Sequence, residues 1–261
     1  MTGIVAVIPS HLASIRFPRK ILFPFSGLPM IEHVRRRALL TKGIDDVYVA
    51  TCDIEIAEAV QAGGGQVIMT ASTHNNGTSR VAEAVTGLPH SHVILLQGDE
   101  PTLLPRHVEA VVSAIKAESD IDAWNATGPI NSLEELDRHS FVKCAVTPLN
   151  RVIYCFRRSP STAAFADQQS YIRKILGIIA FRRDFLLELA VAPRSQVERY
   201  ESIEQMRIIE LGRTLKSVPV DEALPSVNEP QEADIVLDYL QRSEEQRELL
   251  AHVLASGVER P

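Results

Sequence analysis

Cysteine is scarce in this chain, with three residues among 261: Cys52, Cys144 and Cys155. An odd number of cysteines, without paired or metal-like spacing, argues against a disulfide framework and against a zinc site. We therefore expect a reduced, cytoplasmic setting, and a fold that needs neither disulfides nor a structural metal.

Long apolar runs and an excess of basic residues are also missing. No run approaches the ~20 residues that span a bilayer, and residues 1–9 lack the basic start and cleavage site of a signal peptide. With 27 Lys and Arg against 33 Asp and Glu, the net charge of −6 argues against a broad nucleic-acid surface. We expect neither a membrane nor a nucleic acid as a partner. A local anion pocket stays open, because net charge does not describe a single cleft.

The composition, 45% hydrophobic and 23% charged, is that of an ordinary globular protein. A chain of 261 residues predicts one large domain, with room for a small additional lobe.

Short, dense apolar runs alternate with amphipathic segments in the first 117 residues. The predicted strands are 4–8, 47–50, 67–69 and 92–96. The predicted helices are 30–38, 54–62, 79–85 and 105–117. Strands that alternate with helices of this length indicate parallel βαβ units, so we predict an α/β fold with a mainly parallel sheet.

After about residue 120 the pattern changes, because the predicted strands come closer together. They are 122–126, 142–147, 152–156 and 176–181. This spacing indicates an antiparallel or mixed portion of sheet. Helices are predicted again at 203–211, 232–240 and 244–255.

The loop after the first predicted strand, residues 9–20, concentrates positive charge. It carries Arg16, Arg19 and Lys20 within five residues. In open α/β sheets ligands bind beyond the carboxyl ends of the strands, and arginine with lysine suits a polyphosphate. The alternative is a solvated basic loop. The glycine spacing of a Walker or dinucleotide-binding motif is absent.

A second candidate follows the strand at 92–96, in the run Gln97-Gly98-Asp99-Glu100-Pro101. Two carboxylates behind a flexible glycine are able to hold Mg²⁺ while waters and phosphate oxygens complete its shell. The alternative is a turn in which the aspartate caps the next helix.

A third candidate is the polar loop 74–80. Its residues could bind a base or a ribose, with Arg80 bracing the loop. The structural alternative is that Thr78 or Ser79 only caps a helix. The chain has no Gly-x-Ser-x-Gly elbow, so a hydrolase of that kind is not indicated.

Taken in order, these segments resemble the 3-deoxy-manno-octulosonate cytidylyltransferases (CMP-Kdo synthetases) from about residue 3 to residue 240. The matching pieces include Ile8-Pro9, Ala13-Ser14, Arg16, Pro18, Lys20, Gly27, Pro29-Met30-Ile31, Ala50-Thr51, Asp53, His74, Gly77-Thr78, Arg80, Gln97-Gly98-Asp99-Glu100-Pro101, Val142-Lys143, Arg157, Ser159-Pro160, Gly177-Ile178, Glu201-Ser202, Glu204-Gln205 and Arg207. The Gln-Gly-Asp-Glu-Pro run and the collinear order make the resemblance specific.

The resemblance implies an enzyme that joins CTP to a 2-keto-3-deoxy sugar acid, giving a CMP-sugar and pyrophosphate, with Mg²⁺ as cofactor. It also implies a homodimer that supplies lipopolysaccharide or capsule precursors. The implied fold is a Rossmann-like nucleotidyltransferase domain over residues 1–240. Within this domain, residues of about 125–200 form a smaller sugar-binding and dimerisation lobe. After it, we expect residues 241–261 to form a C-terminal helical extension.

The resemblance also implies roles for individual residues. The catalytic residues would be Arg16, Lys20 and Asp99. The nucleotide-binding residues would be Pro9, Ser10, His11, Arg19, Asn75, Gly77, Arg80 and Gln97. The acceptor-binding residues would be Arg157, Ile175, Ile179, Glu204 and Gln205. The metal ligands would be Asp99 and Asn228.

Six positions depart from the family's pattern, among them Cys52 in place of an acidic residue. His11 stands in place of an arginine, Arg19 in place of a glycine, and Asn228 in place of a second metal-binding aspartate. Ile175 and Ile179 stand in place of a histidine and a tyrosine of the sugar site. Two alternatives therefore stay open: a CTP-dependent enzyme for a less hydroxylated acid, and a catalytically weak nucleotide-binding paralogue.

Overall fold

The computed structural model describes residues 3–255. The chain divides into two compact units, one formed by Met1–Glu109 with Leu224–Pro261 and the other by Ala110–Ala223. Of the predicted C-terminal extension 241–261, residues 256–261 lie outside the described part. No helix among the described residues is long and apolar enough to cross a membrane.

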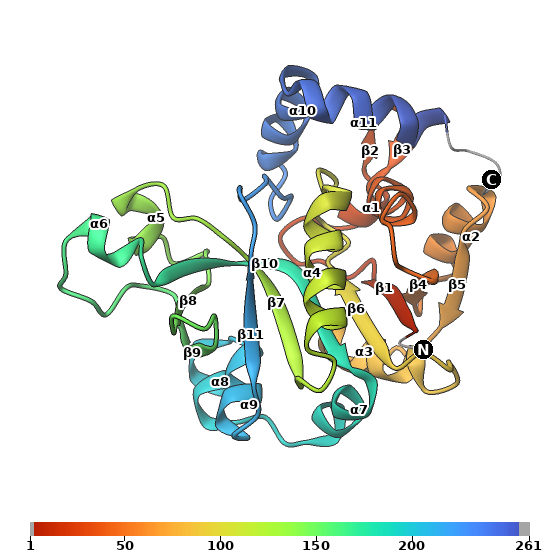
Figure 1. Ribbon diagram of the computed structural model, residues 1–261. Coiled ribbons are helices and arrows are strands. Elements are labelled where there is room, and N and C mark those ends of the chain that lie inside the picture. Colours follow the sequence, from red (N-terminus) through yellow and green to blue (C-terminus); the bar gives the residue numbers. More distant parts are fainter. Residues whose placement is uncertain (1–2, 256–261) are drawn as a thin grey trace. The chain divides into compact units, whose positions relative to one another are not determined.

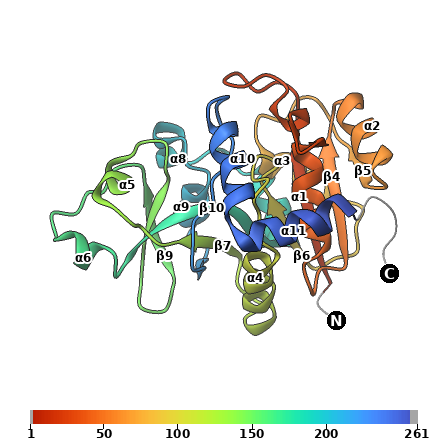
Figure 2. The same cartoon turned by 90° about the horizontal axis from the view of Figure 1, so that it is seen from above.

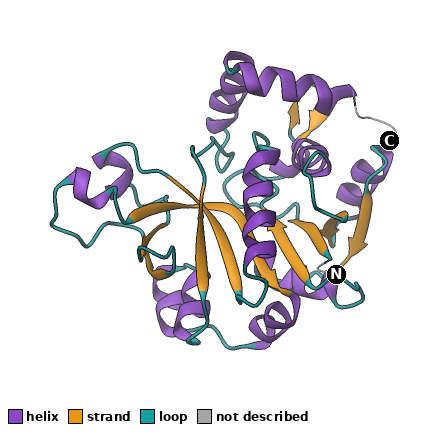
Figure 3. Ribbon diagram, viewed as in Figure 1, coloured by secondary structure: helices purple, strands orange, loops and turns teal. Residues whose placement is uncertain are grey.

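The first unit contains a parallel sheet. Its strands are β1 (Ile4–Ser10), β4 (Asp46–Thr51), β5 (Gln66–Met69) and β6 (His92–Leu96). Within this unit the strand order is β6-β1-β4-β5, and all three pairings are parallel, as the alternating pattern predicts (labelled in Figure 1; strands orange in Figure 3). Residues Ile4–Ile8 have no exposed surface, as expected of a strand covered on both faces.

Helices connect these strands. They are α1 (Met30–Leu39), α2 (Ile54–Ala62) and α3 (Gly77–Val85), and α4 (Pro105–Ala117) follows β6. A 3-10 turn, η1 (Lys20–Leu22), and the short strands β2 (Pro24–Phe25) and β3 (Leu28–Pro29) lie between β1 and α1.

Two boundaries near the predicted nucleotide loops differ from expectation. β1 does not end before Pro9, because Pro9 and Ser10 continue the parallel pairing opposite Ala50 and Thr51. Helix α3 begins at Gly77 rather than at Ser79. Its cap is Asn76, whose side chain accepts a hydrogen bond from the backbone N–H of Ser79.

The chain returns to the first unit for its last two helices, α10 (Glu232–Arg242) and α11 (Glu244–Ala255). Both views place α11 beside α1 (Figures 1 and 2). The guanidinium of Arg36 on α1 donates to the carbonyl of Val253 on α11 at 2.9 Å, and it also pairs with buried Glu32. Val253 is fully buried, so α11 is part of the packed unit rather than an appendage.

The second unit contains a mixed sheet. Its strands are β7 (Ala123–Gly128), β8 (Lys143–Val146), β9 (Val152–Phe156), β10 (Ile172–Arg182) and β11 (Leu215–Pro219). Their order is β11-β7-β10-β8-β9, with β11 and β7 parallel and the other pairs antiparallel, which confirms the predicted change of pattern. The helices are α5 (Leu133–Asp137), α6 (Phe165–Gln168), α7 (Arg183–Val191), α8 (Gln196–Glu201) and α9 (Gln205–Glu210).

Sequence patterns missed parts of this unit. β11 and α7 were not predicted, and β10 begins at Ile172 rather than near residue 176. β10 also runs directly into α7 without a glycine or proline to mark the boundary, and such boundaries are difficult to find from periodicity.

Candidate active site

The loop after β1 is anchored at its base. The backbone N–H of Leu12 donates to the carboxylate of Asp53, which lies beyond the end of β4, at 2.9 Å. Beside it, a Cβ on Gly98 would lie 3.0 Å from Ile21 Cδ1 and 3.2 Å from Ser10 Oγ. A larger residue here would force the Ile21 and Ser10 side chains to shift by a few tenths of an ångström, so glycine suits this close approach of the segment after β6 to the end of β1.

Lys20 and Asp99 form the central ion pair of this region. The Lys20 ammonium lies 2.6 Å from Asp99 Oδ2 and 3.1 Å from the carbonyl of Val227, and both side chains are largely buried. The pair joins the cationic loop to the acidic segment, although the sequence places them 79 residues apart. The residue predicted to hold phosphate and the residue predicted to hold metal thus neutralise one another in this structure.

Asn228 reaches the same place from the end of the chain. The backbone N–H of Val227 donates to the carbonyl of Asp99 at 2.9 Å. The amide oxygen of Asn228 lies 3.4 Å from an Nη of Arg16, at the long end of hydrogen-bond distance. The structure therefore brings together Arg16, Lys20, Asp99 and Asn228, as the resemblance implies.

His11 lies among charged side chains. Partial burial lowers its pKa from the ordinary value, and the positive charges of Arg80 and Lys20 lower it further, against the opposing effect of Asp53 and Asp99. The imidazole is accordingly neutral near pH 7. His11 therefore does not supply the permanent positive charge of the arginine that it replaces.

Arg19 does not restore that missing charge from the neighbouring position. Its guanidinium pairs with Glu55 on α2, at the surface. Its backbone has φ of +61°, in the left-handed region that favours glycine. Arg19 is thus paired with Glu55 in this structure, and its contact with the nucleotide stays a prediction.

The polar loop before α3 is held by its own side chains. His74 bonds through Nδ1 to Ser79 Oγ at 3.1 Å and through Nε2 to Glu83, and this pairing lowers the pKa of the Glu83 carboxyl. Asn75 is exposed in this loop. Gly77 begins the helix, and a Cβ at this position would lie 3.0 Å from Pro9 Cγ, a tight contact.

Arg80 and Gln97 have different surroundings. Arg80 is 4% exposed, and its guanidinium donates to Thr70 Oγ1 at 2.6 Å and to the carbonyl of Ala71. It therefore braces the loop, as expected, and its contact with the nucleotide stays a prediction. Gln97 is exposed immediately after β6.

The side chains at this edge fit a hard divalent cation. Asp99 offers carboxylate oxygens and Asn228 an amide oxygen, the donor types that Mg²⁺ takes from proteins. Ser10 Oγ is buried beside Gly98 and has no hydrogen-bond partner among the described residues. A polar ligand at this edge would satisfy it.

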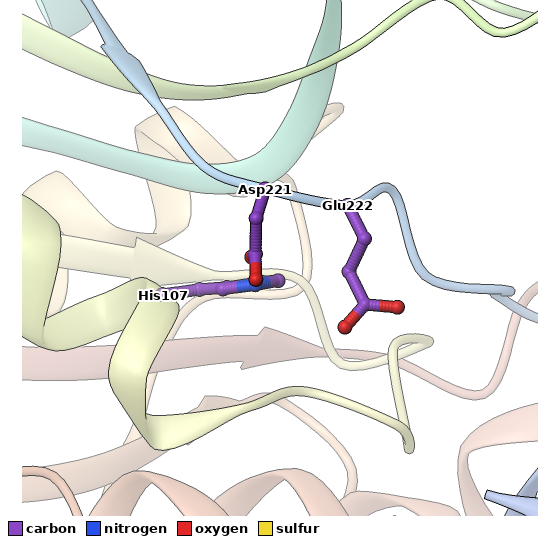
Figure 4. Close-up of side chains that lie close together, drawn as sticks. All are labelled: His107, Asp221 and Glu222. Carbon is purple, nitrogen blue, oxygen red and sulfur yellow. The ribbon is translucent and has the colours of Figure 1, made fainter.

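Figure 4 draws three further side chains of metal-binding types: His107 from α4, and Asp221 and Glu222 from the segment after β11. His107 belongs to the first unit and the two carboxylates to the second. We assign no metal centre to this set.

Arg157, in the second unit, is held by backbone carbonyls. Its Nε donates to Glu201 O at 2.9 Å, and its two Nη atoms donate to His139 O at 3.1 Å and Ser202 O at 3.0 Å. These bonds use three of the five N–H donors of the guanidinium. Arg157 thus orders the loops around it and keeps part of its donor capacity.

Ile175 and Ile179 flank an irregular stretch of β10. Ile175 pairs with Thr127 and Ile179 with Asn125, so β10 advances four residues while β7 advances two. Both isoleucines are half-buried. Extra residues in one strand bend it and re-aim its side chains.

Asn125 holds this irregular stretch in place, and the sequence reasoning missed it. Fully buried, it donates through Nδ2 to Leu176 O at 2.8 Å and to Ile178 O at 3.1 Å. Its Oδ1 accepts from the predicted acceptor residue Gln205 at 3.1 Å, next to Glu204 at the start of α9. The available signal was a polar residue in the middle of an apolar strand.

A Rossmann-like unit whose strand ends gather two cationic side chains, a carboxylate and an amide is the arrangement of a nucleotidyltransferase. The family model "Cytidylyltransferase" matches residues 5–216. The chain belongs to this family, and the resemblance inferred from its motifs is confirmed.

Individual relatives are similar in sequence to most of the chain. It is 36% identical over 230 residues to the 3-deoxy-manno-octulosonate cytidylyltransferase of Escherichia coli, covering 88% of this chain and 93% of that protein. It is 33% identical over 250 residues to the protein of the same name from Geobacter metallireducens, covering 92% and 98%.

Solved structures agree on the fold. The structure titled CMP:2-keto-3-deoxy-manno-octonic acid synthetase complexed with CTP superimposes with a TM-score of 0.87 at 34% identity, covering 92% of this chain and 99% of that one. A 4-diphosphocytidyl-2C-methyl-D-erythritol synthase from Anaerococcus prevotii, at 14% identity and a TM-score of 0.65, shares the fold alone. The predicted α/β nucleotidyltransferase fold is thus confirmed.

Proposed function

We propose that the protein transfers the cytidylyl group of CTP to the anomeric hydroxyl of a 2-keto-3-deoxy sugar acid, Kdo or a close relative. The observation that carries the proposal is the meeting of Arg16, Lys20, Asp99 and Asn228 beyond the carboxyl ends of β1 and β6. This is the place where open α/β sheets bind ligands. The names of the relatives supply the nucleotide and the sugar.

The reaction is an in-line displacement at the α-phosphorus of CTP. A bond forms from the anomeric oxygen to phosphorus, the bond from phosphorus to the pyrophosphate oxygen breaks, and the hydroxyl proton leaves to solvent. Such transfers depend on positioning and on neutralisation of phosphate charge. Arg16 and Lys20 would supply that neutralisation from the loop after β1.

Asp99 and Asn228 would hold Mg²⁺. When bound, the ion supplies Lewis-acid stabilisation of phosphate charge and lowers the pKa of the attacking hydroxyl. An amide in place of a second carboxylate removes one negative charge from the ligand set. We therefore expect half-maximal activity at a higher Mg²⁺ concentration than an Asp–Asp pair would need.

The acceptor side lies in the second unit. Arg157 keeps two N–H donors that suit the carboxylate of a sugar acid. Ile175 and Ile179 offer no hydrogen bonds to hydroxyl groups, and their apolar surface favours an acid with fewer hydroxyls than Kdo. A mismatch between apolar wall and hydroxyl group costs affinity.

The direct test is release of pyrophosphate from CTP with Mg²⁺ across a panel of acceptors. The panel contains Kdo, its amino and deoxy analogues and simpler 2-keto acids, and UTP and ATP replace CTP as controls. Turnover with any acid of the panel supports the proposal, and the preferred acid identifies the acceptor. No turnover with the whole panel would contradict it and favour a nucleotide-binding paralogue.

We further propose that the protein is a cytoplasmic homodimer. Light scattering of the purified protein tests the oligomeric state.

A further inference from the structure

The two segments that carry the predicted metal ligands are joined by two hydrogen bonds. Val227 N donates to Asp99 O at 2.9 Å, directly between the segments. The second bond is formed by Thr102, whose Oγ1 donates to the carbonyl of Pro225 at 2.8 Å. Thr102 lies three residues after Asp99, and Pro225 lies three residues before Asn228. Thr102 has no exposed surface, so water does not compete for this hydroxyl.

The C-terminal helix braces the same threonine from the other side. Gln246 on α11 donates through Nε2 to the carbonyl of Thr102 at 2.8 Å, and Gln246 is itself fully buried. The next carbonyl, that of Leu103, accepts from the buried guanidinium of Arg37 at 3.0 Å. Two side chains from α11 and α1 therefore fix the backbone immediately after the acidic segment.

A metal site depends on the distance between its ligands, because Mg²⁺ demands near-ideal octahedral geometry. Groups that orient ligands without touching the ion typically change metal affinity by about 10- to 100-fold when they are removed. The Thr102 hydroxyl is placed to act in this way, since it holds together the segments that position Asp99 and Asn228.

We infer that Thr102, braced by Gln246 of α11, is a positioning residue that sets the separation of Asp99 and Asn228 and thereby the affinity for the metal–nucleotide complex. The inference rests on the proposed function for the identity of the ligands. It gives α11, which lies beyond the region 5–216 matched by the family model, a part in building the nucleotide site.

The sharpest variant is Thr102→Val, which removes the hydroxyl and keeps the shape. Its matched control is Thr41→Val, the same change at a buried threonine of the same unit whose Oγ1 has no hydrogen-bond partner among the described residues. Thr102→Ser keeps the hydroxyl and should restore wild-type behaviour. Gln246→Leu removes the brace from α11 without changing either segment.

The experiment is isothermal titration of each full-length variant with Mn²⁺ in the presence of CTP and no acceptor, together with the melting temperature. We expect Thr102→Val to weaken Mn²⁺ binding by about tenfold or more, Gln246→Leu to weaken it less, and Thr41→Val and Thr102→Ser to leave it within about twofold. A purely structural role would lower the melting temperature of Thr102→Val without changing Mn²⁺ affinity in the folded protein.

Four outcomes overturn the inference. Equal Mn²⁺ affinity in wild type and Thr102→Val contradicts it alone and leaves the proposed function standing, as does an equal loss in Thr41→Val. A wild-type protein that binds neither CTP nor Mn²⁺ contradicts the proposed function as well. If Thr102→Val does not fold, an unchanged Mn²⁺ affinity in Gln246→Leu contradicts the inference in its place.

Discussion

The two units of the chain use their polar residues differently. In the first, charged side chains from distant loops meet at strand ends, and Lys20 and Asp99 pair there. In the second, Arg157 and Asn125 donate most of their hydrogen bonds to backbone carbonyls. The polar groups of the first unit thus form the proposed site for a charged ligand, whereas those of the second hold an irregular strand in shape.

This difference suggests that nucleotide chemistry depends on a few side chains, and acceptor choice on backbone geometry. Substitutions at the strand ends of the first unit should therefore change turnover and nucleotide affinity. Substitutions around β10 should change the acceptor KM and leave CTP binding unaltered.

The largest effect is expected for Asp99→Asn. Removing the carboxylate charge leaves Lys20 without its ion-pair partner and would deprive the metal of its charged ligand. We expect kcat for pyrophosphate release to fall by roughly 10²-fold or more, the scale of losing an electrostatic catalytic group. Steady-state kinetics with saturating Mg²⁺ measure it, and unchanged turnover would remove Asp99 from the mechanism.

Asn125→Leu tests the acceptor half of the comparison. It removes the donors to Leu176 O and Ile178 O and the acceptor for Gln205. Because small misplacements of binding groups are costly, we expect the acceptor KM to rise by roughly tenfold. The KM for CTP should stay within about twofold. An equal rise in both values would show that the two halves are not separable.

His11→Arg restores a permanent charge beside the predicted triphosphate site. The pKa of His11 is lowered, so the imidazole is neutral at pH 7.5 and gains a proton only as the pH falls through that lowered pKa. We expect the variant to lower the KM for CTP several-fold at pH 7.5, and the advantage over wild type to shrink toward pH 5. A ratio of KM values that does not change with pH would place His11 away from the phosphates.

Arg19→Gly should have the smallest effect, and on stability rather than on activity. Glycine adopts the left-handed backbone found at this position without a steric penalty, while the surface pair with Glu55 contributes little. We expect the melting temperature to rise by about 1–2 °C, with kcat unchanged. Glu55→Gln, which breaks the pair alone, is the control, and a lower melting temperature in Arg19→Gly would show that the pair outweighs the backbone strain.

The sequence predicted the first unit well for a physical reason. Parallel strands buried on both faces are continuous apolar runs, and their carboxyl ends share one edge of the sheet. The positions of Lys20 and Asp99 could therefore be inferred from local patterns. The pairing of Arg19 with Glu55 and the burial of Arg80 could not, because they depend on which helix packs nearby.

The second unit was less predictable because its determinants are non-local. The irregular stretch of β10 is defined by its register against β7, and a side chain of β7 stabilises it. No pattern within 172–182 shows that. The apolar substitutions at Ile175 and Ile179 were visible in the sequence, but the part played by Asn125 was not.

The first unit is assembled from two stretches of chain that are more than one hundred residues apart. During synthesis, residues 3–109 leave the ribosome long before Gln246, whose amide completes the support of Thr102. A nascent chain in which both β1 and β6 have been synthesised therefore still lacks part of the proposed nucleotide site. If Gln246 supports the proposed site, CTP affinity should thus appear late in translation, once α11 has been synthesised.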